Sequence, residues 1–550
     1  MTRKHRSSKH SQGDTSRQFE GRFYRNLIII AVVGTFLSFF IPQFIPPIFF
    51  GPQIEGPVRA AVISQLILLL SVFLLMLLTI GENRQKYIRK QNMEDYMRLV
   101  RAERRIRHTE AVKQLSDTSQ SIRLGSIYTL INLVDEWLTD DNLSSEEQTQ
   151  EGQTIINDIC AYICSPFSQT FKIEGCEADV DTSAYTGDFI TDQAIFRNEQ
   201  EIRRTIFAEI SKRSSTLLKD EDESVEGSVI PGEWSRFTFD FNRSIIFYPL
   251  DGLNIENAVF SGAKFYDEAV FHRTTFIGNI DFNHAIFKDT AVFDYATFAG
   301  DVNFSAAVFK RDARFRNTIF VGSSDFSGAR FNGDAFFSWG NFKANTDFRD
   351  TYFSGHAEFH GVAFIADVGF SRASFIERIS FFRTYFGGNT SFFKVVFAGD
   401  TDFLEATFKK QVGFNGASFW RGANFSRTRF GGLAGFPHTT FKESVAFTGA
   451  TFIKNTDFCD ASFIEQPPIF VDENKEAGMI RRAQFAALPL SDSQEAGNFK
   501  VSRTSIPIPL DTAELNSIIY HIPVGTVLFD PDSWDEQNKE YTRVSAPAGR

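Results

Sequence analysis

The sequence of 550 residues has few of the side chains from which disulfide frameworks and catalytic sites are built. It contains four Cys and nine His. The cysteines show no paired spacing, so the chain is expected to reside in a reducing compartment with free thiols. No P-loop, G-x-S-x-G, H-E-x-x-H or EF-hand pattern occurs, and the histidines are scattered. The sequence therefore predicts neither an enzyme nor a bound cofactor.

Three of the cysteines can be compared with a zinc site. Cys160, Cys164 and Cys176 have the spacing C-x3-C-x11-C, which could supply three zinc ligands. No His lies nearby to complete the set, and Cys160 and Cys164 fall on the apolar side of an expected short helix. Buried structural thiols are the favoured interpretation, and no metal site is predicted.

An excess of one charge is missing from the middle of the chain. The formal net charge is -11, yet residues 241–463 contain 22 Lys and Arg and 22 Asp and Glu. The acidic excess lies earlier, in residues 101–240, with 14 basic and 27 acidic residues. Because its charges balance, this region has no continuous electrostatic field that would attract a polyanion or imitate one, so no nucleic acid partner is expected.

Two long runs contain almost no charge. Residues 26–45 have none, and twenty residues at helical rise match a hydrocarbon thickness of about 30 Å. Residues 58–80 contain only Arg59, which can reach the membrane interface. A secretory signal peptide is the alternative for the first run, but no small-residue cleavage site follows it. The runs predict two transmembrane helices, with the lipid bilayer as a partner.

Basic residues predict the orientation of this hairpin. Seven Lys and Arg precede the first run, and Arg84, Lys86, Arg89 and Lys90 follow the second, whereas the connecting loop has none. The positive-inside rule therefore places both termini in the cytoplasm. The chain is expected to be a multi-pass protein of the cell inner (plasma) membrane.

Helical patterns follow the second run. Residues 83–115 are charged and lack Pro and Gly, which favours a juxtamembrane helix. A turn is expected at 116–119, then a longer apolar-faced helix, a short helix at about 154–163 after an acidic linker, and another over 191–217. Together these segments form a predicted helical module over residues 82–225.

Phenylalanine is the abundant residue, with 63 Phe against 13 Tyr and 5 Trp. From Phe260 to Phe463 the Phe spacing alternates between five and six, and Phe occupies all 38 positions of this rule. The residue two places before each Phe is always small or β-branched, so both face the same side of an extended strand. Polar residues and Gly between them suit tight corners. Each unit is therefore predicted to form one side of a coil with Phe pointing inward.

This ladder resembles the pentapeptide-repeat family, whose consensus is a central Leu or Phe preceded two residues earlier by Ala. The resemblance implies a right-handed quadrilateral β-helix with four repeats per coil. The family's strict spacing is five, whereas every second interval here is six. This alternation suggests that a coil contains four units, with two opposite sides one residue longer than the other two. A tighter coil of only two units remains an alternative.

The helical module is also similar to one that precedes the repeats in bacterial membrane-anchored pentapeptide-repeat proteins. The shared pattern is AVxQL followed by RLGxIYxL. It is carried here by Ala111, Val112, Gln114, Leu115, Arg123, Leu124, Gly125, Ile127, Tyr128 and Leu130. This resemblance implies a packed helical adaptor and no chemistry.

The expected fold class is a membrane hairpin, an α-helical module and an all-β pentapeptide-repeat solenoid. Upstream of the ladder, Phe237, Phe239, Phe241, Phe247 and Leu253 indicate a degenerate first coil, and exposed solenoid ends require caps. The predicted parts are a basic tail (1–25), two transmembrane helices (26–81), the helical module (82–225), the β-helix (237–470) and a C-terminal cap or tail (471–550).

Aromatic residues outside the ladder are the candidate partner contacts, because they should point outward from a regular surface. They are Phe336, Trp339, Phe382, Phe393 and Trp420. Packing under the helical module or the C-terminal segment is the alternative explanation. His356 and His360 flank the ladder residue Phe359 and are interpreted as solvent-facing.

These features predict a membrane-anchored cytoplasmic scaffold for an unidentified protein partner, with a homo-oligomer as a further possibility. A regulatory or structural subunit of a membrane transport assembly is the second candidate. A DNA mimic that interacts with gyrase is the third, and the neutral middle argues against it. Asp281, Asp325, Asp347, Asp402 and Asp457 could form an acidic stripe, but a solvated polar ladder is the favoured interpretation.

Overall fold

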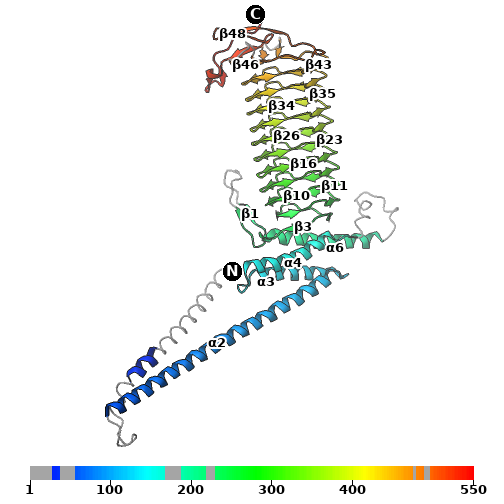
Figure 1. Ribbon diagram of the computed structural model, residues 1–550. Helices are drawn as coiled ribbons and strands as arrows, with labels where there is room; N and C mark the ends of the chain where they lie inside the picture. The colour runs from blue at the N-terminus through cyan, green and yellow to red at the C-terminus, as the bar shows by residue number, and fades with distance from the viewer. Residues whose placement is uncertain are drawn as a thin grey trace. The chain divides into compact units, whose positions relative to one another are not determined.

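The computed structural model describes residues 28–36, 56–167, 188–217, 229–474, 479–488 and 496–549. The chain divides into two compact units, residues 1–106 and residues 107–550 (Figure 1). The first unit is helical in its described residues. The second contains a helical module and a tall stack of short strands.

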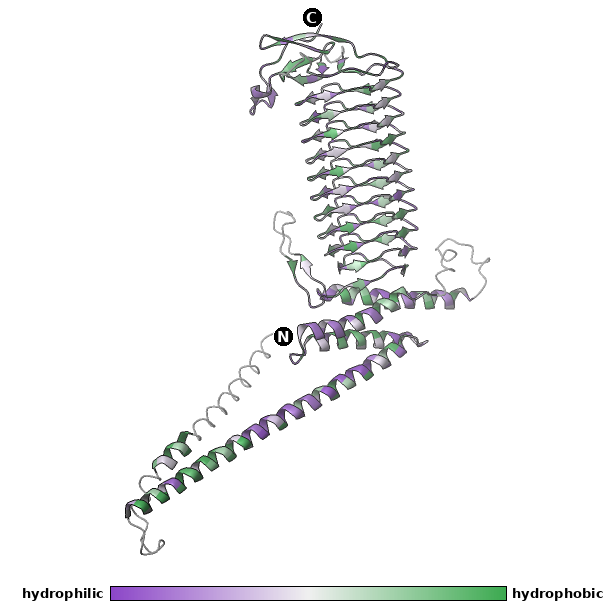
Figure 2. Cartoon of the chain, viewed as in Figure 1, coloured by the Kyte–Doolittle hydropathy of each residue, from purple (hydrophilic) through white to green (hydrophobic). Residues whose placement is uncertain are grey.

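The first unit is dominated by α2 (Gly56–Gln114), a helix of 59 residues that continues into the second unit. The predicted second transmembrane run and the juxtamembrane helix are thus one unbroken helix. Figure 2 shows that α2 is hydrophobic at its start and hydrophilic further along. Among the described residues, α2 is the one helix long and apolar enough to cross a bilayer. Of the predicted first transmembrane helix, residues 28–36 are helical, and its remaining residues lie outside the described part.

The helical module consists of α3 (Gln120–Leu138), α4 (Ser145–Cys164) and α6 (Phe189–Arg213). The prediction of a short helix at 154–163 was wrong at its start, because Ser144 and Glu147 form a capping box that begins α4 earlier. The predicted helix over 191–217 ends at Arg213, and residues 216–217 form the strand β1 (Thr216–Leu217).

The solenoid is built from four parallel sheets, named here first to fourth in the order in which each coil visits them. The first sheet extends from β3 (Phe239–Asp240) to β47 (Gly497–Asn498), and the second from β4 (Ile245–Ile246) to β43 (Ser462–Phe463). The third extends from β8 (Ala269–Val270) to β40 (Val445–Ala446), and the fourth from β5 (Asn254–Glu256) to β50 (Val527–Phe529). Within the ladder, each strand pairs with the strand four units further along the chain, as in Ile286 with Val308. The coil of four units is therefore confirmed, and the alternative of two units is excluded.

The alternating spacing follows from two kinds of corner. After the first and third sheets the interval is five, and the second residue after Phe turns the chain with a φ between 53° and 72°. After the second and fourth sheets, which lie opposite each other, the corner has one more residue. At Gly300 and Gly322 in these corners, an added Cβ would lie 2.2 Å and 2.4 Å from backbone atoms of the preceding coil. Glycine there permits the close approach of successive coils.

The core consists of columns of stacked phenylalanine rings. All 38 ladder Phe side chains are at most 1 % exposed. Rings one coil apart are nearly parallel, as in Phe287 and Phe309, whose centroids are 4.7 Å apart with an interplanar angle of 1°. Rings on opposite sides of a coil meet edge to face, as in Phe304 of the first sheet and Phe315 of the third. Both geometries are favourable for aromatic pairs.

The helical module closes the start of the solenoid. Phe207 of α6 lies 4.8 Å from Phe241 and 6.4 Å from Phe260, measured between ring centroids. Arg203 is 1 % exposed and donates to Glu199 at 2.7 Å and to the Ile163 carbonyl at 2.7 Å. Glu199 also pairs with Arg123 of α3 and accepts a hydrogen bond from the Tyr162 hydroxyl of α4 at 3.1 Å, so one buried carboxylate connects the three helices. The module thus covers apolar rings that the first coil would otherwise expose.

The other end is closed by an irregular coil. Phe470, Phe485 and Phe499 continue three of the ring columns by stacking on Phe447, Phe452 and Phe458. Each follows its stacking partner at a longer interval along the chain than the regular ladder has. The longer intervals contain inserted segments, including the hairpin of β44 (Val471–Asn474) and β45 (Met479–Arg482). A second hairpin, β48 (Leu510–Leu515) and β49 (Ile518–Pro523), follows.

Replacing one inward ring tests this core. Phe359 stacks on Phe337 at 4.8 Å and on Phe381 at 5.1 Å. We expect Phe359→Ala to lower the free energy of unfolding by about 3–5 kcal/mol because a cavity remains between the two rings. The control is His360→Ser, since Ser338 occupies the equivalent position one coil earlier, and its cost should stay below about 1 kcal/mol. Equal shifts of the urea midpoint for both variants would contradict the inward assignment.

Candidate binding surfaces

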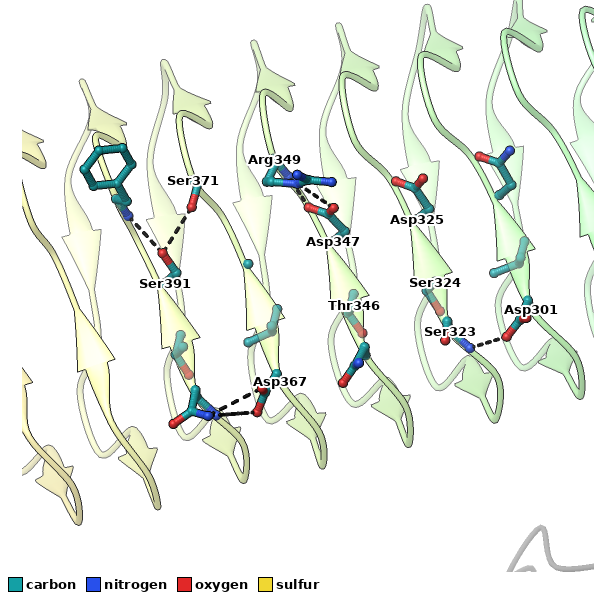
Figure 3. A pocket seen from close by; sticks show the side chains of 18 of the residues that line it. Asp301, Ser323, Ser324, Asp325, Thr346, Asp347, Arg349, Asp367, Ser371 and Ser391 are labelled. Atoms are coloured by element: carbon teal, nitrogen blue, oxygen red, sulfur yellow. Dashed lines mark hydrogen bonds and ion pairs between the residues drawn. The ribbon is translucent and has the colours of Figure 1, made fainter.

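A groove extends along the first sheet. It has a volume of about 1260 Å³ and extends from Ala258 to Asn415. Figure 3 shows its polar side chains at successive rungs, among them Asp325 and Asp347 on neighbouring strands. Five aspartates and one arginine line it: Asp281, Asp301, Asp325, Asp347, Asp367 and Arg349. Four of the five residues of the suggested acidic stripe belong to the first sheet, and Asp402 belongs to the third.

These aspartates have a structural role in the corners. In Asp281, Asp325 and Asp347, one carboxylate oxygen accepts a hydrogen bond from the backbone N–H two residues later, each at 2.8 Å. Asp402 and Asp457 do the same at 3.0 Å and 2.9 Å. Such Asx turns explain why short acidic side chains recur at these positions. Asp347 is further neutralised by Arg349 at 2.6 Å.

The five predicted contact residues lie on three different sheets. Phe336, Trp339 and Phe382 belong to the third sheet and its corner, Phe393 lines the groove of the first sheet, and Trp420 follows a strand of the second sheet. Trp339, Phe393 and Trp420 are 58 %, 40 % and 53 % exposed, whereas Phe336 and Phe382 are half-buried. The structure therefore brings together three of the five.

On the third sheet the aromatic side chains of successive coils form a column. The ring centroids of Trp339 and His360 are 5.0 Å apart, and those of His360 and Phe382 are 4.8 Å apart. His360 is thus half-buried between two aromatic rings, and the interpretation of this residue as merely solvent-facing was incomplete. The ladder register places His360 and Phe382 in one line along the sheet, but the equivalent position one coil earlier is Ser338 and Trp339 is the next residue. Register alone could therefore have revealed only part of the column.

Trp339 occupies the corner position at which the chain turns with a positive φ. Its φ of 62° is a conformation that large side chains rarely adopt, and the equivalent residues one coil before and after are Asn317 and Gly361. A Cβ added to Gly361 would lie 2.6 Å from the Trp339 ring, so glycine makes room for the indole over the next coil. The exposed tryptophan therefore requires two local features, a strained positive φ at Trp339 and the absence of a side chain at Gly361.

A pocket of about 450 Å³ opens beside this tryptophan. Its lining includes Phe336, Trp339 and His360 together with Asp334, Glu358 and Arg378. Ser338 donates to Glu358 at 3.3 Å, and the His356 N–H donates to Asp334 at 2.8 Å. The sequence analysis did not name Asp334, Glu358 and Arg378, because they become neighbours of the aromatic side chains only when the coils stack in register, as Glu358 does beside Phe336.

The cysteines of the helical module are shielded from solvent. Cys160 is buried, Cys164 is half-buried, and Cys176 lies outside the described residues. Burial raises the pKa of the Cys164 thiol to about 11 and raises the pKa of Cys160 further. A zinc ligand requires the thiolate, which this environment disfavours. In the part of the chain that the structure describes, no group of three His, Cys, Asp or Glu side chains could hold a metal ion.

Comparison with known proteins identifies the repeats. Residues 251–297, 293–338 and 392–440 match the family model of pentapeptide repeats, with nine copies. No curated protein and no solved structure matches the chain. The matched residues all lie within the solenoid.

Thiol alkylation tests the buried-cysteine assignment. At pH 7 we expect Cys160 to remain unlabelled and Cys164 to react slowly, because a raised pKa leaves little thiolate. The Cys164 rate should rise by about tenfold per pH unit as pH approaches the pKa. Mass spectrometry of peptides from the labelled full chain measures both rates. A chelator that accelerated Cys164 labelling at constant pH would instead indicate a bound metal.

Proposed function

We propose that this chain, whose solenoid is built from pentapeptide repeats, is a non-catalytic docking scaffold held at a membrane by its N-terminal helices. The observation that carries the proposal is the column of Trp339, His360 and Phe382 on the third sheet. Exposed tryptophan beside a pocket is the usual composition of a protein-binding hot spot. A rigid solenoid presents such a patch with little loss of backbone conformational entropy on binding.

The membrane part of the proposal rests on the first unit. Large apolar side chains of α2, such as Leu66, Leu69 and Leu70, are exposed, as expected for a helix that contacts lipid. The segment 28–36 approaches α2 closely, since a Cβ added to Gly34 would lie 2.7 Å from the Ser71 Cβ. Small residues at such crossings are typical of transmembrane helix pairs. These contacts support two neighbouring helices at the membrane, and the proposed cytoplasmic placement of both termini rests on the basic residues that flank the predicted runs.

DNA mimicry is the weaker alternative. It requires a dense negative field, and residues 241–463 are neutral. The aspartates of the first sheet are accounted for by their Asx turns. The proposed scaffold therefore recognises a protein through aromatic contacts and not through a phosphate-like charge pattern.

Two exposed tryptophans provide a matched test of docking. Trp339→Asn combined with Phe382→Ser removes the column and introduces residues that occupy equivalent positions in earlier coils, Asn317 and Ser338. We expect this variant to recover at least about tenfold less partner from solubilised membranes than the unaltered full chain. Trp420→Ala is the control, because Trp420 is similarly exposed but lies on another sheet. Equal recovery by all three chains would refute docking at the third sheet.

Reporter fusions test the membrane topology. A fluorescent protein joined after residue 85 or at Arg550 should be fluorescent, and alkaline phosphatase at the same sites should be inactive, because basic residues flank both predicted runs on that side. Active phosphatase at either site would place it outside the cytoplasm. Recovery of the full chain in the carbonate-soluble fraction would contradict membrane insertion altogether.

A further inference from the structure

The aromatic residues of the third sheet repeatedly stack with arginine from the same chain. The guanidinium of Arg316 lies 4.2 Å from the Phe336 ring centroid, that of Arg383 lies 4.9 Å from Phe382, and that of Arg273 lies 5.9 Å from Tyr295. These contacts are within the distance at which cation–π attraction is significant. The aromatic rings of this sheet therefore bind guanidinium groups within the chain itself.

Trp339 is the exception in this pattern. Within the described residues no Lys or Arg lies over its ring, although indole is the strongest cation–π acceptor among the side chains. One part of the ring covers Gly361, and more than half of the side chain remains exposed. The largest ring of the column is thus left without the partner that its neighbours have.

The pocket beside Trp339 supplies the complementary charge. Asp334 and Glu358 line it, and neither is in an ion pair among the described residues. Arg378 also lines the pocket and is exposed. The two carboxylates and one guanidinium that line the pocket leave one net negative charge among its lining residues. A planar cation could stack on the ring while its N–H groups donate to a carboxylate.

We propose that this pocket receives an arginine side chain of the docking partner, stacked on Trp339 and hydrogen-bonded to Glu358 or Asp334. The inference rests on the proposed scaffold function and specifies the chemistry of its partner. A lysine fits less well, because its ammonium is a compact, strongly hydrated point charge without a plane to lie on the indole. The half-buried position of Glu358 strengthens the contact relative to a fully exposed pair.

A titration observed at Trp339 itself tests the proposal. The chain has five Trp, so the full protein labelled with 5-fluorotryptophan gives a small set of fluorine NMR signals. Trp339→Asn and Trp420→Ala assign two of them. The probe is the peptide acetyl-Gly-Arg-Gly-amide, compared with versions that carry lysine or citrulline in place of arginine. Citrulline keeps the planar shape and removes the charge.

We expect the arginine peptide to shift the Trp339 signal with saturation and to leave the Trp420 signal unchanged. The citrulline peptide should bind about tenfold more weakly, and Asp334→Asn with Glu358→Gln should weaken arginine binding by a similar factor. Arg378→Gln should tighten it by about threefold, because a like charge is removed. Equal shifts by arginine and citrulline, or no shift at millimolar peptide, would overturn the proposal.

The outcome is separable from that of the docking test. If the Trp339 and Phe382 variant loses its partner but the arginine peptide does not bind, docking stands and the arginine assignment is wrong. If the peptide binds with the expected selectivity but partner recovery is unchanged, the pocket selects arginine and the scaffold proposal fails.

Discussion

The structure depends on the stacking of phenylalanine rings at the spacing of successive coils. Parallel strands in adjacent coils are separated by about 4.8 Å, and parallel aromatic rings pack well at nearly the same distance. The ring centroids of Phe276 and Phe298 are 4.5 Å apart, and those of Phe414 and Phe436 are 4.9 Å apart. The same distance between coils therefore suits both the backbone hydrogen bonds between strands and the stacking of the rings.

Because these inward-facing rings form the core, the outward-facing positions of the solenoid can carry many kinds of side chain. The ladder requires Phe, a small residue two places earlier and a corner that turns, and the remaining side chains are not needed for the core. Some of them stabilise corners, as the aspartates of the first sheet do. Others, such as Trp339, occupy a strained corner and contribute nothing to the core. Outward side chains can therefore change without loss of the fold, and this allows a binding site to be placed on the solenoid.

The solenoid ends need a different solution, because a repeat presents unpaired edges and apolar rings at both ends. At the start, α6 places Phe207 on the first rings, and the buried group of Arg203, Glu199 and Arg123 connects the helices of the module. At the other end the ring columns continue through Phe470, Phe485 and Phe499 after the regular spacing has been lost. The same aromatic contact thus closes the core where the repeat no longer applies.

The sequence by itself determined the inward ring at every ladder position, the small residue paired with it and the apolar start of α2, because these follow from local spacing and composition. The sequence favoured four units per coil, and the tertiary structure decided this number, since alternating intervals of five and six are also compatible with a coil of two units. It also decided which exposed aromatic residues are neighbours. Phe336, Trp339 and Phe382 lie on one sheet and its corner, and Phe393 and Trp420 lie on two others, because side chains in successive coils become adjacent only when the coils stack.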